Sequence, residues 1–358
     1  MATLTEYKCP SCGGVIEFDS QSQKMKCPYC STEFDVETVE TYNQALYQKD
    51  SQMSWQNPTG TSWHKEETAQ LSSYLCHSCG GEIITDKNTI ATNCPYCDNK
   101  VVLNEQVEGI LRPHLVIPFQ YDKQNAMAAL KKHFEGKKLL PPLFKNENHL
   151  EEIKGIYVPY WLYDCDVEGD YIYRAQRTRS HSDGNYNYTY TDHFMLKREG
   201  DIHFQNIPAD GSAKMADDLM DSLEPFDYNQ AVDFNTAYLA GYFADRYDVL
   251  ASDNQEKINQ RIMTTVNDAF YSTTHSYGMT SIVNHTTHFN QSQIQYALLP
   301  VWLLNTTWNN QKYVFVMNGQ TGKLVGDLPM DKKLYWKYFG IYFGIGTIIT
   351  AAISLLFV

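Results

Sequence analysis

Basic residues are scarce in this sequence. The chain of 358 residues has 29 Lys and Arg against 42 Asp and Glu, which gives a formal net charge of −13. Proteins that bind a phosphate backbone do so mainly with clustered lysine and arginine, which release counterions. The short runs Lys131-Lys132, Lys137-Lys138 and Arg174 to Arg179 are typical of solvated faces. Nucleic acid is therefore not the expected partner on charge grounds, and a nucleic-acid-binding protein of replication or transcription type is kept as the alternative hypothesis.

The sequence also lacks a phosphate-binding loop. The nearest segment, Asn318-Gly-Gln-Thr-Gly-Lys323, has two residues between its first glycine and Gly-Lys, where the Walker A motif needs four. Asn318-Gly319 instead predicts a hairpin turn. ATP-driven chemistry is not expected, and no convincing catalytic constellation is present. An enzyme, such as a hydrolase using His and Asp, is the third hypothesis.

No signal peptide precedes the first cysteine, because the chain starts Met1-Ala-Thr-Leu-Thr-Glu6. The cysteines are therefore expected in a reducing cytosol, where disulfides are rare. Cys165 is the odd cysteine, and its neighbours Asp164 and Asp166 are expected to raise the pKa of its thiol, which predicts an inert side chain.

Eight cysteines form four Cys-x-x-Cys pairs in a duplicated pattern. Fourteen residues separate the two pairs of each set, and the second set follows the first by 67 residues. Gly13-Gly14 recurs as Gly80-Gly81, and the Cys-Pro-Tyr-Cys motif occurs in both sets. The predicted ligands are Cys9, Cys12, Cys27 and Cys30 for the first site, and Cys76, Cys79, Cys94 and Cys97 for the second.

This spacing predicts two structural metal sites. Two tight turns, each with a pair of cysteines, close a four-thiolate cage around Zn²⁺ and leave no open position for catalysis. A redox Cys-x-x-Cys pair would occur once, within a βαβ pattern. Iron stays as the alternative metal, since four thiolates suit both ions. A fragment this small cannot fold on its apolar core alone, so the metal would stabilise it.

The expected fold class is α+β, with two small four-cysteine zinc ribbons, an α+β domain with mainly antiparallel sheet, and one C-terminal transmembrane helix. The predicted segments are zinc ribbon 1 at 1–36, a polar linker at 37–72, zinc ribbon 2 at 73–106, the α+β domain at 107–330 and the transmembrane helix at 334–358.

Within the α+β domain, hydrophobic spacing predicts helices after Asp122 and Asp253, and another over 238–248. Residues 156–163 and 297–304 resemble each other, and each is followed by a second apolar stretch, at 171–175 and 313–317. These segments predict two hairpins, in which a proline enters the strand, and a possible internal duplication.

Two other groups of polar residues are candidates for a site. The histidines, among them His285 and His288, lie in alternating strand-like runs that favour half-exposed polar residues over a metal site. The acidic run from Asp217 to Glu224 is more typical of a solvated helix face than of a cation site.

The C-terminal residues 338–358 contain no charge and are rich in Ile, Phe, Gly and Leu. A helix of this length spans about 30 Å, the thickness of the bilayer hydrocarbon. Lys332, Lys333 and Lys337 precede it, so the positive-inside tendency places the bulk of the chain in the cytoplasm. The prediction is a single-pass tail anchor in the cytoplasmic membrane. Gly340 and Gly344 have the spacing of a helix-dimer motif, which makes a homodimer possible.

Several motifs together resemble one protein family. They are Cys9-Pro-Ser-Cys-Gly-Gly14, Cys27-Pro-Tyr-Cys30, Tyr157-Val-Pro-Tyr-Trp-Leu162, Leu299-Pro-Val-Trp302 and Asn318-Gly-Gln-Thr-Gly322. The chain resembles bacterial membrane-anchored proteins with TFIIB-type zinc ribbons, some of which are labelled primosomal helicase-like. The resemblance implies the eight ribbon cysteines as zinc ligands, no catalytic residues, and work beside flotillin-like or phage-shock-type proteins.

These observations lead to one functional hypothesis. The chain is expected to be a membrane-anchored cytoplasmic adaptor without enzymatic activity. Its two zinc ribbons would recruit protein partners at the inner membrane face. The family resemblance implies that these partners belong to membrane-stress assemblies.

Overall fold

The computed structural model describes residues 6–46, 53–56, 58, 62–104, 111–145 and 152–356. The chain forms two compact units. Unit 1 comprises Met1–Asn57, Tyr163–Ile207 and Ser252–Ile294, and unit 2 comprises Pro58–Leu162, Pro208–Ala251 and Gln295–Val358. The fold is α+β, as expected, with a small antiparallel sheet and a larger sheet of mixed direction.

Unit 1 begins with the first cysteine set. Three short strands, β1 (Glu17–Asp19), β2 (Lys24–Lys26) and β3 (Glu33–Phe34), form a separate antiparallel sheet. Helix α1 (Val36–Ala45) follows, and its Asn43 side chain accepts a hydrogen bond from the Lys8 amide at 2.7 Å. We call residues 7–34 ribbon 1.

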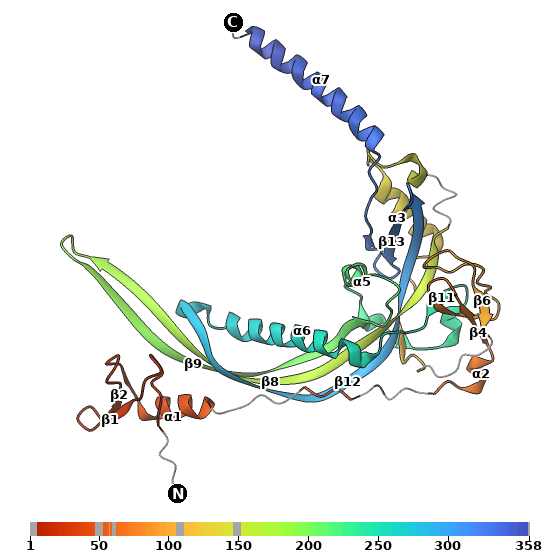
Figure 1. The fold of residues 1–358 in the computed structure, drawn as a ribbon. Coiled ribbons are helices and arrows are strands. Elements are labelled where there is room, and N and C mark those ends of the chain that lie inside the picture. Colours follow the sequence, from red (N-terminus) through yellow and green to blue (C-terminus); the bar gives the residue numbers. More distant parts are fainter. Residues whose placement is uncertain are drawn as a thin grey trace. The chain divides into compact units, whose positions relative to one another are not determined.

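The rest of unit 1 consists of long strands and one helix. Strands β8 (Lys154–Ser182), β9 (Asn187–Asp210) and β12 (Met279–Trp308) run side by side, with α6 (Ala251–Ser272) along one face (Figure 1). The helix predicted after Asp253 does form, although it begins two residues earlier, at Ala251. Its buried apolar residues include Ile258, Ile262, Val266 and Phe270. Phe270 packs so closely on Gly169 of β8 that an added Cβ there would lie 2.5 Å from its ring.

Unit 2 is a sheet covered by a helix on each face. Even-numbered residues 156–162 of β8 and odd-numbered residues 297–303 of β12 pack against α5 (Asp217–Leu223). The alternate residues of β12, together with β13 (Gln311–Asn318), pack against α3 (Lys123–Phe134). This alternation follows from the two-residue period of a strand. The predicted cap of α3 is confirmed, since Asp122 accepts a hydrogen bond from the Asn125 amide at 2.7 Å.

The second cysteine set is part of the large sheet of unit 2. Strands β4 (Leu71–Leu75), β5 (Glu82–Asp86) and β6 (Val102–Asn104) are antiparallel, and β5 also pairs with β11 (Phe243–Asp245). We call residues 71–104 ribbon 2. Other short elements complete the unit: α2 (Lys65–Thr68), β7 (Leu115–Val116), β10 (Val232–Asp233) and β14 (Leu324–Val325).

Two parallel pairings make the large sheet mixed. Strand β11 runs parallel to β8, and β12 runs parallel to β7. The other pairings with a defined register, such as β12 with β13, are antiparallel. The large sheet is therefore mixed, although most of its pairings with a defined register are antiparallel, as expected.

Two local predictions are wrong, and two others are confirmed. Residues 238–248 do not form a helix, because Gly241 has φ +81° and β11 follows. The predicted hairpin 156–175 is one uninterrupted strand, with Pro159 inside it. The predicted hairpin 297–317 does form, from β12 and β13, as does the turn at Asn318-Gly319 between β13 and β14.

The C-terminal prediction also needs correction. Helix α7 (Lys332–Leu356) does form. Among the residues that the structure describes, however, no helix is long and apolar enough to cross a membrane, which contradicts the transmembrane helix predicted for 334–358.

Candidate metal centres

The structure brings the eight predicted ligand residues together in two groups of four. We call Cys9, Cys12, Cys27 and Cys30 cluster 1, and Cys76, Cys79, Cys94 and Cys97 cluster 2; in each, all sulfur atoms lie within 4.8 Å of one another. All eight cysteines are free thiols. Within the described part of the chain, these are the only groups of three or more His, Cys, Asp or Glu side chains positioned to hold a metal ion.

The sulfur separations fit a tetrahedral metal site. The Cys9–Cys30 and Cys12–Cys27 sulfurs are 3.7 and 3.5 Å apart, and the Cys76–Cys97 and Cys79–Cys94 sulfurs are 3.5 and 3.6 Å apart. A metal–sulfur bond of about 2.3 Å gives a tetrahedron whose edge is about 3.8 Å. A disulfide would need about 2.05 Å. Both clusters can therefore hold one metal ion each.

The turns that present the sulfurs are nearly the same in both ribbons. In ribbon 1 the Gly13 amide donates to the Cys9 carbonyl at 2.8 Å, and in ribbon 2 the Gly80 amide donates to the Cys76 carbonyl at 2.8 Å. Gly13 and Gly80 have φ values of +77° and +70°, which only glycine adopts readily. In the other turn of each ribbon, Ser31 and Asp98 take the left-handed conformation, with φ values of +60° and +59°. The sequence pattern drew attention to the glycines but not to these two residues.

The thiols within each cluster differ in acidity. Burial raises the pKa of Cys9 to about 12 and also raises the pKa of Cys94. Burial acts in the same direction on Cys30 and Cys97, but hydrogen bonds from Thr32 and Asn99 lower the pKa of each to about 6. A metal ion must therefore displace protons from the buried thiols.

Ribbon 2 is fixed to its unit by polar contacts around cluster 2. The Lys154 ammonium donates to the Cys94 carbonyl at 3.3 Å and to Asp98 at 2.9 Å. Arg246 pairs with Glu82 at 2.6 Å. The Asn305 amide donates to the Tyr96 carbonyl at 3.1 Å. The contacts of Lys154 and Asn305 hold the Cys-Pro-Tyr-Cys turn, and the ion pair of Arg246 holds the start of β5.

A buried acidic group lies beneath that turn. Asp245 is 1% exposed and accepts a hydrogen bond from the Ser212 hydroxyl at 2.5 Å. The buried Tyr96 hydroxyl lies beside this carboxyl but has no hydrogen bond of good geometry. Burial raises the pKa of Asp245 to about 7, and it raises the pKa of Asp210 likewise.

The equivalent turn of ribbon 1 is open to solvent. Tyr29, which corresponds to Tyr96, has 74% of its surface exposed, and Pro28 is exposed where Pro95 is buried. Nearby lysines are paired within the ribbon and its flank: Lys26 with Glu33 at 3.0 Å, and Lys24 with Asp35 at 3.7 Å. The same motif is thus an internal anchor in ribbon 2 and an exposed aromatic surface in ribbon 1.

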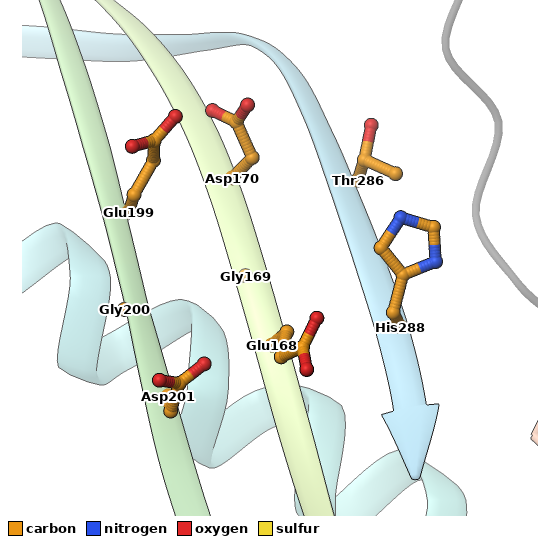
Figure 2. A pocket seen from close by; sticks show the side chains of 8 residues that line it. All are labelled: Glu168, Gly169, Asp170, Glu199, Gly200, Asp201, Thr286 and His288. Atoms are coloured by element: carbon orange, nitrogen blue, oxygen red, sulfur yellow. The ribbon is translucent and has the colours of Figure 1, made fainter.

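The other candidate residues do not join either cluster. Cys165 is buried. Its burial, and to a smaller extent the charges of Asp166 and Asp164, raise the pKa of its thiol to about 12. The sequence predicted a raised pKa from the two aspartates. His288 lines a cavity of about 380 Å³ with Glu168, Asp170, Glu199, Asp201 and Thr286 (Figure 2). Three of the four carboxylates of this cavity have protein partners: Lys197 pairs with Asp170 and Glu199, and Asn290 donates to Glu168.

The chain is thus a two-ribbon protein with a pair of four-cysteine clusters. No family model matches it, and no solved structure matches it. It is 31% identical over 330 residues to a protein of Bacillus subtilis (strain 168) described as uncharacterized protein YdjG, a match that covers 92% of this chain and 91% of the relative. The chain belongs to the YdjG family.

The metal content follows from the geometry. We expect two metal ions per full-length chain, since each cluster offers four sulfurs. Replacing Cys9 and Cys12 with serine should remove one ion and leave the other. Elemental analysis measures the count and the metal, and cobalt substitution should give the spectrum of a tetrahedral thiolate site. One ion per chain in the unaltered protein would contradict this prediction.

Asp245 should make stability depend on pH. Between its ordinary pKa, about 4, and 7, the folded protein retains a proton that the unfolded chain releases. The free energy of unfolding therefore falls as pH rises through this window. An asparagine at position 245 cannot ionise, so the Tm of the Asp245→Asn variant should depend less on pH. Between about pH 5.5 and about pH 8, the Tm of the unaltered protein should fall by about 5 °C more than that of the variant. Thermal unfolding measures this, with the exposed Asp268→Asn as control. Parallel curves for Asp245→Asn and the unaltered protein would rule the idea out.

Proposed function

We propose that the protein is a non-enzymatic adaptor whose ribbons hold Zn²⁺ and whose ribbon 1 recruits a protein partner. The observation that carries the proposal is the contrast between Tyr96, whose hydroxyl is buried in unit 2, and Tyr29, which is 74% exposed. Exposed aromatic residues on rigid turns are typical anchors of protein interfaces. In ribbon 2 this turn is already used to bind a protein surface, its own unit.

Charge favours a protein over a nucleic acid as the partner. The net charge is −13, and two lysines of ribbon 1 are paired with carboxylates. Zinc bound to four thiolates adds a further net negative charge to each ribbon. The resemblance to proteins with TFIIB-type ribbons supports membrane-stress proteins, flotillin-like or phage-shock-type, as the first partners to test.

The proposal is tested at position 29. We replace Tyr29 with photoreactive benzoylphenylalanine in the full-length protein in cells, and use Phe18, a 53% exposed residue of the same ribbon, as the matched control position. Irradiation should give one discrete protein adduct from position 29 and not from position 18. Tyr29→Ala should weaken affinity for the identified partner by about 30-fold, as expected for an aromatic anchor, with unchanged metal content.

Two results would reject the adaptor proposal. Equal adduct yields at both positions would show that the turn has no specific partner. Recovery of nucleic acid in place of protein, with an affinity that falls steeply with salt, would favour the alternative hypothesis of a nucleic-acid-binding protein.

We also propose that α7 brings the protein to the inner face of the cytoplasmic membrane. The proposal concerns contact with lipid and not a crossing. Phe343 and Ile348 of α7 are 65% and 71% exposed, and such apolar side chains favour an apolar environment. Lysines gather near the start of the helix: Lys332, Lys333 and Lys337 belong to it, and the Lys138 ammonium lies 6.0 Å from the centre of the Tyr338 ring. Lysines beside apolar helices are attracted to anionic lipid.

Vesicle binding tests this location. The full-length protein should sediment with vesicles that contain anionic lipid and much less with neutral vesicles. Replacing Lys332, Lys333 and Lys337 with glutamine should reduce binding about 100-fold, since each of the three lysines contributes about 1 kcal/mol near an anionic surface. The control is Lys312→Gln, an exposed lysine of β13. A protein that stays in the supernatant with both vesicle types would contradict the proposal.

A further inference from the structure

The two clusters differ in what holds their ribbons in place. The core around cluster 1 is local: Cys9, Ile16, Met25, Cys27 and Val39 are its buried members, and its partly buried neighbours are Tyr7, Cys30 and Phe34. All of these residues lie between positions 7 and 39. The three strands of ribbon 1 form a sheet separate from the large one. Ribbon 1 can therefore open by breaking contacts that are mostly its own.

Ribbon 2 shares its core and its sheet with distant parts of unit 2. Phe243 packs into the core around cluster 2, and β5 pairs with β11 through Ile84 with Ala244 and Ile83 with Asp245. The contacts of Lys154, Arg246 and Asn305 add three more attachments. Opening ribbon 2 therefore requires that these long-range contacts break as well.

The ligands also differ in accessibility. Cys12 is the one exposed residue of the eight, whereas its counterpart Cys79 is partly buried. A chelator or a competing thiol removes a metal ion by contacting the ion or a ligand atom. Cluster 1 offers such a contact at Cys12 even without opening.

We propose that cluster 1 is an exchangeable metal site and cluster 2 a permanent one. Metal release at a folded site is limited by the free energy of local opening, and this differs widely between parts of one protein. Because opening ribbon 2 breaks the β5–β11 pairing and the ion pairs, its metal ion leaves more slowly. Loss of one or two such contacts changes an opening equilibrium about tenfold, so the release rates differ by about tenfold or more.

The exchangeable site controls the surface at Tyr29. Pro28 and Tyr29 lie between the ligands Cys27 and Cys30, so the metal ion fixes the turn that presents them. Loss of the ion from cluster 1 removes this turn and, with it, binding of the partner. This consequence rests on the proposed adaptor function, whereas the difference in release rates does not.

Release of Zn²⁺ from the loaded full-length protein tests the proposal. A coloured chelator in excess, such as 4-(2-pyridylazo)resorcinol, follows the release over time. We expect two phases of one ion each, with rates that differ by about tenfold or more. The fast phase should be absent in the variant with Cys9→Ser and Cys12→Ser, which keeps cluster 2 intact.

Docking variants test the cause of the slow phase without touching a ligand. Arg246→Ala and Lys154→Ala should each speed the slow phase several-fold and leave the fast phase unchanged. Arg179→Ala is the matched control, since it removes an exposed ion pair, with Asp192, that joins β8 to β9 and involves no residue of either ribbon. A single phase for both ions, a fast phase that survives loss of cluster 1, or a slow phase insensitive to both docking variants would overturn the proposal.

A second readout separates this proposal from the adaptor function. Photocrosslinking at position 29 is repeated after the chelator has removed the fast ion. Two release phases with a crosslink lost in step with the fast ion support both proposals. Two phases without any crosslink at position 29 in the loaded protein support the metal proposal and reject the adaptor function.

Discussion

The pairing of β5 with β11 is the interaction on which the arrangement of unit 2 depends. It joins Ile83 and Ile84 of ribbon 2 to Asp245 and Ala244. A small ribbon has too little apolar surface to be stable alone. By adding its strands to a larger sheet, ribbon 2 gains a core that includes Phe243 and a polar surface around its second cysteine turn. The burial of the Tyr96 hydroxyl and the ion pairs of Glu82 and Asp98 all follow from this junction.

The duplicated ribbons show how few residues decide between a fixed and a free module. Both keep the glycines, the cysteines and the Pro-Tyr turn. Ribbon 2 has Glu82 and Asp98, which pair with Arg246 and Lys154, where ribbon 1 has Val15 and Ser31 at the equivalent positions. Ribbon 1 therefore lacks both ionic attachments but keeps the tyrosine. Because the metal ligands alone can determine the fold of a ribbon, its outer residues are free to diverge in this way.

Local patterns were predictable and long-range pairings were not. Cysteine spacing identified both clusters, and apolar spacing identified α3 and α6, because ligands and helix faces are encoded over a few turns. The segment 238–248 was misassigned because β11 is defined by its partners β5 and β8, which lie far away in the sequence. The continuity of β8 was missed as well, because 156–163 and 171–175 were predicted to be the two strands of a hairpin. The different exposure of Tyr29 and Tyr96 cannot be read from identical motifs; it depends on Glu82, Asp98 and their partners.

The buried carboxyl of Asp245 needs an explanation, because an apolar residue in its place would avoid the cost of removing a charge from water. The two groups beside this carboxyl, Ser212 and Tyr96, indicate its structural role. Ser212 donates to one oxygen, and the Tyr96 hydroxyl lies beside the group. A wholly apolar pocket would accept the ring of Tyr96 in several orientations. A buried polar group such as Asp245 favours the orientation that brings the tyrosine hydroxyl next to the carboxyl group. We infer that Asp245 lowers the stability of the fold but restricts ribbon 2 to a single docking position, which also fixes the position of cluster 2.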